Sequence, residues 1–347
     1  MMSSNFDTPT LVAALKAAAE PTRLRILLLL RAGELNVKDL TEILGQSQPR
    51  ISRHLKLLSE AGLVERFREG SWVYFHVSDR TEGGRLALRL LDAVNRGDPL
   101  VRRDLERAEA SKREREAAAQ AYFGDHAADW DRIRALHVAE HDVEAAMREA
   151  LGAGPFKQFL DLGTGTGRSL ELFADRYERG LGLDVNQSML ALARAKLTMA
   201  AFGNAQVRHG DIYNLTMPDR VADAIVMHQV LHYLSEPQRA IAEAARVLAP
   251  GGRLLIVDFA PHDLDFLREK HAHERLGFAR EHVNQWILDA GLNPLGGRDL
   301  APSERAGTEK LTVSIWLGER APLLEADEKE PNAVRDAART LQFERMR

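Results

Sequence analysis

Three aspartates lie at or just beyond the ends of three apolar segments that the sequence predicts to be β-strands. Asp161 and Asp184 fall at the ends of the first two segments, and Asp211 follows the third. The segments are Phe156–Leu162, Gly180–Val185 and Ala205–His209. The carboxyl ends of parallel strands meet at one edge of a sheet, so we expect the three carboxylates to share a cavity. Carboxylates there can grasp a ribose diol and attract positive charge, which predicts a site for a cationic nucleoside.

A glycine-rich loop follows the first of these segments. Glycine alternates with threonine over Gly163–Gly167, and glycine permits a tight strand-to-helix turn and the close approach of a ligand to the main chain. Dinucleotide-binding loops need a glycine where Arg168 stands, so NAD and FAD fit poorly. Each aspartate alone could simply cap a turn or a helix. Together with the loop, the three favour a ligand site.

Strand-like and helix-like segments alternate around this loop. Further strands are expected at 223–228, 253–259, 292–300 and 311–317, and helices at 169–176, 237–249 and 281–290. This alternation predicts a Rossmann-like, doubly wound parallel α/β sheet with its ligand at the carboxyl ends of the strands. We assign residues 122–318 to this domain.

These motifs resemble those of the class I S-adenosylmethionine-dependent methyltransferases, especially the ubiquinone and menaquinone biosynthesis group. The resemblance implies that S-adenosylmethionine or S-adenosylhomocysteine is the cofactor. It implies that Asp161 and the glycine loop hold the methionyl part, that Asp184 binds the ribose, that Asp211 and Ile212 frame the adenine, and that His228 lies under the cofactor. The implied cofactor-binding residues are Asp161, Gly163, Thr164, Gly165, Gly167, Asp184, Val185, Asp211, Ile212 and His228. A lid is implied near Tyr122, Phe123, Trp130 and Asp131.

Two histidines close to the end of the 223–228 segment are candidate catalytic bases. His228 is the last residue of this segment, and His232 follows four residues later. Methyl transfer from a sulfonium requires mainly proximity and orientation, and a base only where the acceptor must lose a proton. For each histidine, a packing role at the sheet edge is an equally open interpretation.

Histidines also gather between residues 262 and 282, where imidazoles and carboxylates could ligate a metal. The residues are His262, Glu269, His271, His273, Glu274 and His282. Helical spacing places His271 and His273 on different faces, so we favour a polar exposed helix and expect no metal. The sequence has no cysteine, which excludes disulfides, thiolate metal sites and cysteine nucleophiles. Arsenite methylation, which uses thiols, is excluded with them.

The N-terminal segment predicts helices separated by glycine turns, followed by a hairpin. Helices are expected from Pro21, from Asn36 and from Ser47, and the hairpin turns at Gly70. This order is that of a winged helix-turn-helix, which we place at residues 8–96. The polar residues of its recognition helix and hairpin are of the types that contact base edges and phosphates. They could also form only the solvated face of an amphipathic helix, but the order of the elements favours DNA binding. The expected DNA-binding residues are Gln46, Ser47, Gln48, Arg50, Ser52, Arg53, His54, Lys56, Arg66 and Arg68.

This segment resembles the ArsR-type winged-helix repressors. The resemblance rests on the stretches Ala19–Leu27, Gln48–Leu58 and Ala61–Val64. It implies a homodimer formed by the first and last helices of the domain, which binds an inverted-repeat operator, usually as a repressor. The metal-sensing cysteines of some relatives are absent beside Asp39, and Asp92 stands alone on the last helix. The signal must therefore come from elsewhere in the chain.

Residues 97–121 are rich in charge and predict a helix that buries little. We interpret this segment as a semi-rigid spacer, with packing in a dimer interface as the alternative. A polar tail is expected at 319–347, frayed or only loosely docked.

The whole chain of 347 residues has a net charge of −4, so any DNA-binding surface must be local. No apolar run is long enough to cross a membrane, and the start of the chain lacks a signal pattern, which predicts a cytoplasmic protein. Three hypotheses remain open: a regulator that senses the cofactor, an active methyltransferase of a small molecule that carries a targeting head, and a vestigial dimerisation platform.

Overall fold

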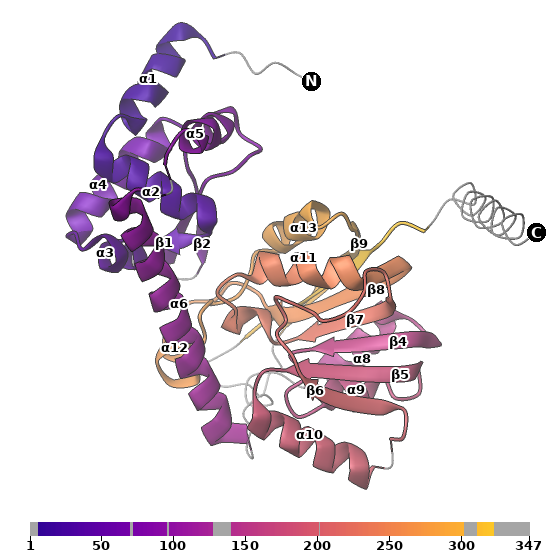
Figure 1. Cartoon of the computed structure of the whole chain (residues 1–347). Coiled ribbons are helices and arrows are strands. Elements are labelled where there is room, and N and C mark those ends of the chain that lie inside the picture. The colour runs from indigo at the N-terminus through magenta and orange to yellow at the C-terminus, as the bar shows by residue number, and fades with distance from the viewer. Residues whose placement is uncertain are drawn as a thin grey trace, which may run out of the picture.

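Two lobes joined by one long helix make up the computed structural model (Figure 1). The structure describes residues 6–69, 72–95, 97–127, 140–200, 202–301 and 311–322. The connecting helix is α6 (Pro99–His126). Within the described residues, no helix is both long and apolar enough to traverse a bilayer.

The N-terminal lobe has the helical order of a winged helix-turn-helix. Its elements are α1 (Thr8–Ala18), α2 (Pro21–Ala32), β1 (Leu35–Asn36), α3 (Val37–Leu44), α4 (Gln48–Glu60), β2 (Glu65–Glu69), β3 (Trp72–His76) and α5 (Glu82–Asp92). Asn36 and Asp39 form a reciprocal capping box at the start of α3. Gly45 ends α3 in the left-handed region, with φ of 63°, a conformation that glycine adopts without strain. The turn between α3 and α4 is therefore fixed by local sequence, as expected.

The C-terminal lobe is a seven-stranded sheet with helices on both faces. Its elements are α8 (Glu140–Leu151), β4 (Phe156–Leu162), α9 (Arg168–Leu172), β5 (Tyr177–Asp184), α10 (Gln187–Met199), β6 (Ala205–His209), β7 (Ala222–His228), η2 (Leu231–Tyr233), α11 (Pro237–Val247), β8 (Leu248–Phe259), α12 (Phe266–His271), α13 (Arg280–Asp289), β9 (Asn293–Leu300) and β10 (Val313–Glu319). The strand order is β6-β5-β4-β7-β8-β10-β9. The order reverses at β4, where such sheets bind their ligands.

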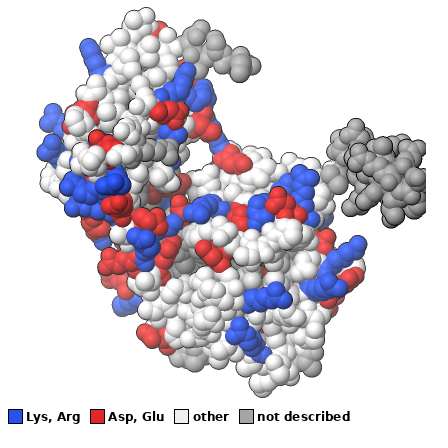
Figure 2. Space-filling view, viewed as in Figure 1, with Lys and Arg blue, Asp and Glu red and all other residues white. Residues whose placement is uncertain are grey.

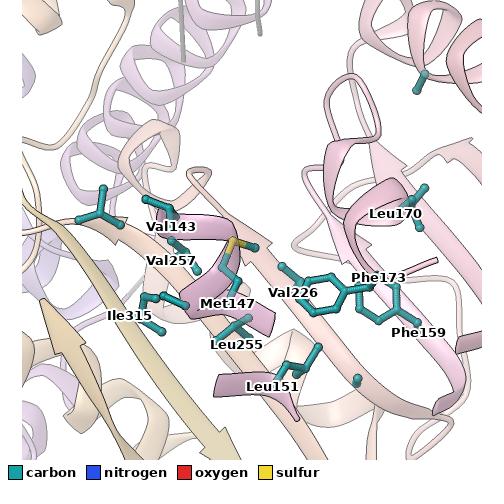
Figure 3. Close-up of a cluster of buried hydrophobic side chains, with 14 of the residues drawn as sticks. Val143, Met147, Leu151, Phe159, Leu170, Phe173, Val226, Leu255, Val257 and Ile315 are labelled. Atoms are coloured by element: carbon teal, nitrogen blue, oxygen red, sulfur yellow. The ribbon is translucent and has the colours of Figure 1, made fainter. Parts of the chain in front are cut away.

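The sheet is mixed rather than wholly parallel as expected. Strands β4 to β8 pair in parallel. Strand β10 enters between β8 and β9 and runs antiparallel to both. Apolar side chains fill both faces. In Figure 3, Val143, Met147 and Leu151 of α8 pack towards the sheet residues of one apolar core, which includes Leu255, Val257 and Ile315.

Helix α6 is more than the expected spacer. It packs on α2 and α3 of the N-terminal lobe and on α10 of the C-terminal lobe. The buried carboxylate of Asp104 accepts hydrogen bonds from Arg25 Nε at 2.5 Å and Nη2 at 2.8 Å. Such pairs, made between residues far apart in the sequence, give no periodic apolar signal, which is why the charge-rich sequence suggested a solvated helix.

Substitution of Asp104 by alanine should destabilise the N-terminal lobe by about 3 kcal/mol, because it leaves the Arg25 guanidinium partly buried without its carboxylate. The side chain of Asp104 is only 3% exposed. Urea denaturation followed by circular dichroism measures the change. Glu106→Ala is the matched control, since this side chain on the same helix is 67% exposed. Equal stability of both variants would contradict a structural role for the Asp104 pair.

Candidate functional site

A cavity of about 360 Å³ lies at the carboxyl ends of the parallel strands, with α6 as one wall. Its lining is mostly apolar. The strand side contributes Gly163, Thr164, Gly165, Thr166, Ser169, Leu183, Asp184, Val185, Met189, Gly210, Asp211, Ile212, Tyr213, His228, Gln229, Val230, Tyr233 and Leu234. The α6 side contributes Glu116, Ala117, Ala119, Gln120 and Phe123. An apolar cavity with a few convergent polar groups is typical of a small-molecule site.

The glycine loop holds the main chain close to the cavity. Gly163 has φ of 73°, Gly165 of 50° and Gly167 of 85°. A Cβ on Gly163 would come within 2.4 Å of Val230 Cγ2, so only glycine fits there. Gly167 lies outside the cavity lining and instead occupies the N-cap position of α9. Arg168 turns away from the loop and forms a two-pronged pair with Glu144 of α8.

Asp184 is the polar centre of the strand side. Its Oδ2 accepts the Gly165 N–H at 2.9 Å, and its Oδ1 accepts the Asn186 N–H at 2.8 Å. Each oxygen keeps a further lone pair that can accept a hydroxyl group from a ligand. Burial raises the pKa of Asp184, against the effect of these N–H groups. A hydrogen-bonding ligand would therefore offset a cost of desolvation already present in the free protein.

The other two aspartates differ in position. Asp211 lines the cavity, and its Oδ1 accepts the Tyr213 N–H at 2.8 Å. Asp161 is 1% exposed and lies behind the loop rather than in the cavity lining. Its Oδ2 accepts the Thr164 hydroxyl at 2.6 Å. Asp161 therefore supports the loop from within, whereas Asp184 and Asp211 face the shared space.

The α6 wall of the cavity is the part that sequence reasoning largely missed. Among the residues expected to form a lid, Phe123 lines the cavity, while Trp130 and Asp131 lie outside the described residues. The Asn186 side-chain amide donates to the Gln120 carbonyl oxygen at 3.0 Å and so joins α6 to the start of α10. Residues 97–121 carry no strong apolar stripe, so their pattern did not indicate that this helix would form a wall of the cavity.

The two candidate bases lie in different surroundings. His228 lines the cavity at the end of β7. His232 is 2% exposed and outside the cavity lining, with its Nδ1 at 2.7 Å from Asp258 Oδ1. The geometry of His232 corresponds to the packing interpretation, and of the two histidines only His228 contacts the cavity.

The histidines between 262 and 282 do not converge on one point. Within the described part of the chain, no group of three or more potential ligands could hold a metal ion. His271 accepts or donates a hydrogen bond with the Tyr122 hydroxyl at 2.7 Å. The His273 ring lies tilted against the His232 ring with their centroids 4.2 Å apart, whereas His282 contacts Phe67 of the N-terminal lobe.

Burial lowers the pKa of His262 from 6.5 to about 4, and the nearby His232 acts in the same direction. Because the pKa is lower in the folded state, the unfolded chain binds the proton first. The free energy of unfolding should therefore fall as the pH drops from 6.5 towards 4. We expect this histidine to contribute about 2 kcal/mol of that loss, discounted for its partial exposure. Denaturation of the wild type and of His262→Gln across this range tests it, and parallel curves would contradict it.

The expected DNA-binding residues form a largely exposed surface on α4 and β2. The exposed members are Ser47, Gln48, Arg50, Ser52, Arg53, Lys56, Arg66 and Arg68. The other two are partly buried. Gln46 donates to the Thr22 hydroxyl at 3.4 Å, and His54 lies 3.7 Å from Glu20, with its pKa lowered by burial. The exposed surface therefore includes eight of the ten expected residues. Figure 2 shows basic and acidic side chains interspersed on the visible face, consistent with a local rather than a global positive field.

Comparison with known proteins identifies both lobes. Residues 20–66 match the bacterial regulatory protein, arsR family, and residues 160–256 match a methyltransferase domain. The chain thus joins an ArsR-type winged helix-turn-helix to a Rossmann-like methyltransferase domain, which confirms both resemblances.

Several relatives cover parts of the chain. An uncharacterized 37.1 kDa protein in transposon TN4556 of Streptomyces fradiae is 30% identical over 168 residues, which is 44% of this chain and 48% of that protein. A demethylmenaquinone methyltransferase of Renibacterium salmoninarum is 28% identical over 49% of this chain and 68% of its own length. A ubiquinone/menaquinone biosynthesis C-methyltransferase of Teredinibacter turnerae is 37% identical over 32% and 47%. The chain spans about half the length of most such curated relatives. The crystal structure of the YcgJ protein of Bacillus subtilis superposes with a TM-score of 0.45 and 18% identity, over 53% of this chain and 100% of that one.

Proposed function

We propose that this chain is a DNA-binding transcriptional regulator, acting as a repressor, whose methyltransferase domain binds S-adenosylmethionine or S-adenosylhomocysteine as its effector. It works in the cytoplasm as a homodimer on an inverted-repeat operator. The winged helix supplies the DNA contacts, with Arg50 and Arg53 at the exposed start of α4. No metal is required for the signal.

The donor set of the cavity supports this choice of ligand. Asp184 has free lone pairs on both oxygens for the two ribose hydroxyls, and Asp211 with Ile212 would flank the adenine. The glycine loop would receive the methionyl part through its main chain, with Asp161 holding Thr164 in place. Acidic groups around the cavity favour a ligand that carries an ammonium and, in one form, a sulfonium charge.

The observation that carries the regulatory proposal is the continuity of α6. One helix of 28 residues contacts α2 and α3 of the DNA-binding lobe and also lines the cavity through Glu116, Gln120 and Phe123. Arg107 donates to the Ile43 carbonyl at 3.2 Å, and Arg115 lies 3.1 Å from Asp39, so both ends of α3 are held. A ligand that prefers one placement of α6 would therefore bias the helix-turn-helix.

Titration of each ligand into a DNA-binding assay tests the proposal. We expect the operator affinity of the full chain to change about 5- to 150-fold with one of the two ligands, the range of typical coupling free energies. The DNA should be a duplex selected by the protein from random sequences. Ligand binding seen by calorimetry with no change in DNA affinity would defeat the regulatory function.

A second candidate function is methyl transfer to a small molecule, with the winged helix as a targeting or autoregulatory module. S-adenosylmethionine supplies a transferable methyl group when bound. The observation that favours this function is the position of His228, which lines the apolar cavity at the end of β7 and could accept a proton from an acceptor. Incorporation of labelled methyl groups into a cell extract, lost in Asp184→Ala, would support catalysis.

A further inference from the structure

We propose, resting on the regulatory function above, that Arg275 is a latch that transmits occupancy of the cavity to the wing hairpin, defined as β2 and β3. The main chain of Arg275 is bonded to the turn that lines the cavity, and its side chain is bonded to the DNA-binding lobe. The Arg275 side chain reaches the wing, whereas its neighbour Glu274 lies 3.1 Å from Arg115 of α6.

On the cavity side, the latch begins at the short helix η2. Val230, Tyr233 and Leu234, in and around η2, line the cavity. Between them, the His232 carbonyl accepts the N–H groups of Glu274 at 2.9 Å and Arg275 at 3.0 Å. The His232 ring is in turn held by Asp258. A ligand that displaces η2 must therefore displace residues 274 and 275 with it.

On the wing side, the guanidinium of Arg275 is almost wholly inside the protein, with 2% of the side chain exposed. It lies 3.1 Å from Glu34 Oε2 and 4.3 Å from the ring centroid of Tyr74 in β3. Glu34 also contacts His282 Nε2 at 3.4 Å. A buried pair of this kind resists separation, since each charge would be left without its partner.

Two neighbouring contacts also hold the wing hairpin against the C-terminal lobe. The Arg268 guanidinium lies over Trp72 at 4.4 Å, and His282 meets Phe67 edge-on at 4.3 Å. The C-terminal lobe thus covers one face of the wing hairpin. Arg66 and Arg68 alternate with Phe67 along β2 and are exposed. The position of these two arginines therefore depends on a surface that the cavity can move.

The test compares Arg275→Gln and Glu34→Gln with the control Arg298→Gln, whose arginine lies on β9 and pairs with Glu149. Calorimetry gives the affinity for S-adenosylmethionine and S-adenosylhomocysteine, and anisotropy gives operator affinity with and without each ligand. We expect ligand affinity to stay within about threefold in all variants, because neither Arg275 nor Glu34 lines the cavity. The ratio of operator affinities should fall towards one in Arg275→Gln and Glu34→Gln only. An unchanged ratio in both would overturn the latch.

Hydrogen exchange at residues 65–69 and 72–76 separates this inference from the proposed function. In the wild type, bound ligand should change the protection of these wing amides at least twofold, and the change should vanish in the two latch variants. Tyr74→Leu, which removes the stacked ring without changing charge, provides a second probe if Arg275→Gln folds poorly. If bound ligand changed the hydrogen exchange of the wing amides but not the operator affinity, the regulatory function alone would be rejected. If bound ligand left the hydrogen exchange of the wing amides unchanged, the latch would be rejected.

Discussion

Replacement of Asp184 by alanine should weaken the binding of S-adenosylmethionine and S-adenosylhomocysteine by about 100-fold or more. A hydrogen bond to a charged acceptor contributes about 1.5–3 kcal/mol, and this carboxylate would receive two ribose hydroxyls, so a loss near 3 kcal/mol corresponds to about 100-fold. The same change removes the acceptor of the Gly165 N–H and so loosens the loop that faces the ligand. Isothermal titration calorimetry of the full chain measures the effect.

Two further variants make this result specific. Asp184→Asn keeps the shape and one acceptor oxygen, so we expect an intermediate loss of affinity. Asp142→Ala removes a carboxylate of α8 that is 74% exposed and distant from the cavity lining, and should leave ligand affinity unchanged. Wild-type affinity in Asp184→Ala would show that the ribose is not bound at the end of β5.

The double variant Arg50→Ala, Arg53→Ala should lower operator affinity by about 100-fold or more at physiological salt. Both side chains are exposed near the start of α4, the end of a recognition helix that meets base edges. Each lost base contact costs about 1–3 kcal/mol, and each lost phosphate contact also reduces the salt slope by about one. A homodimer would lose every such contact twice. Fluorescence anisotropy at several salt concentrations gives both quantities.

The charge-matched control for this variant is Arg102→Ala, Arg103→Ala. These arginines are exposed on α6, so their removal changes net charge equally without touching α4. We expect the control to weaken DNA binding only modestly through the overall field. If the two double variants behaved alike, the α4 surface would not be the site of DNA recognition.

Local signals predicted much of the fold and part of the cavity. Strand ends and glycine turns are encoded by neighbouring residues, so the spacing of Asp184 and Asp211 was enough to expect them at one edge. The position of Asp161 could not be read in the same way. Its side chain lies at the end of β4 as expected, but it is buried and accepts a hydrogen bond from the Thr164 hydroxyl. Nothing in the spacing of the aspartates indicated this contact within the loop.

The contacts between the lobes could not be predicted from the sequence. Arg275 and Glu34 are 241 positions apart, and Arg115 and Asp39 are 76 apart. Single charged pairs of this kind carry no periodicity, and a charged residue in a sequence most often faces solvent. The same absence of signal made residues 97–121 look like a solvated spacer and made His282 look like an exposed helix residue.

The continuity of α6 also restricts how the length of this segment can change. Each residue of a helix adds a rotation of about 100° and a rise of about 1.5 Å. One residue inserted midway would therefore rotate one lobe against the other by about a quarter-turn. Contacts between the lobes, such as that of Arg275 with Glu34, would then be lost. An unstructured tether would absorb the same insertion without consequence, so the number of residues in this helix sets the angle between its lobes.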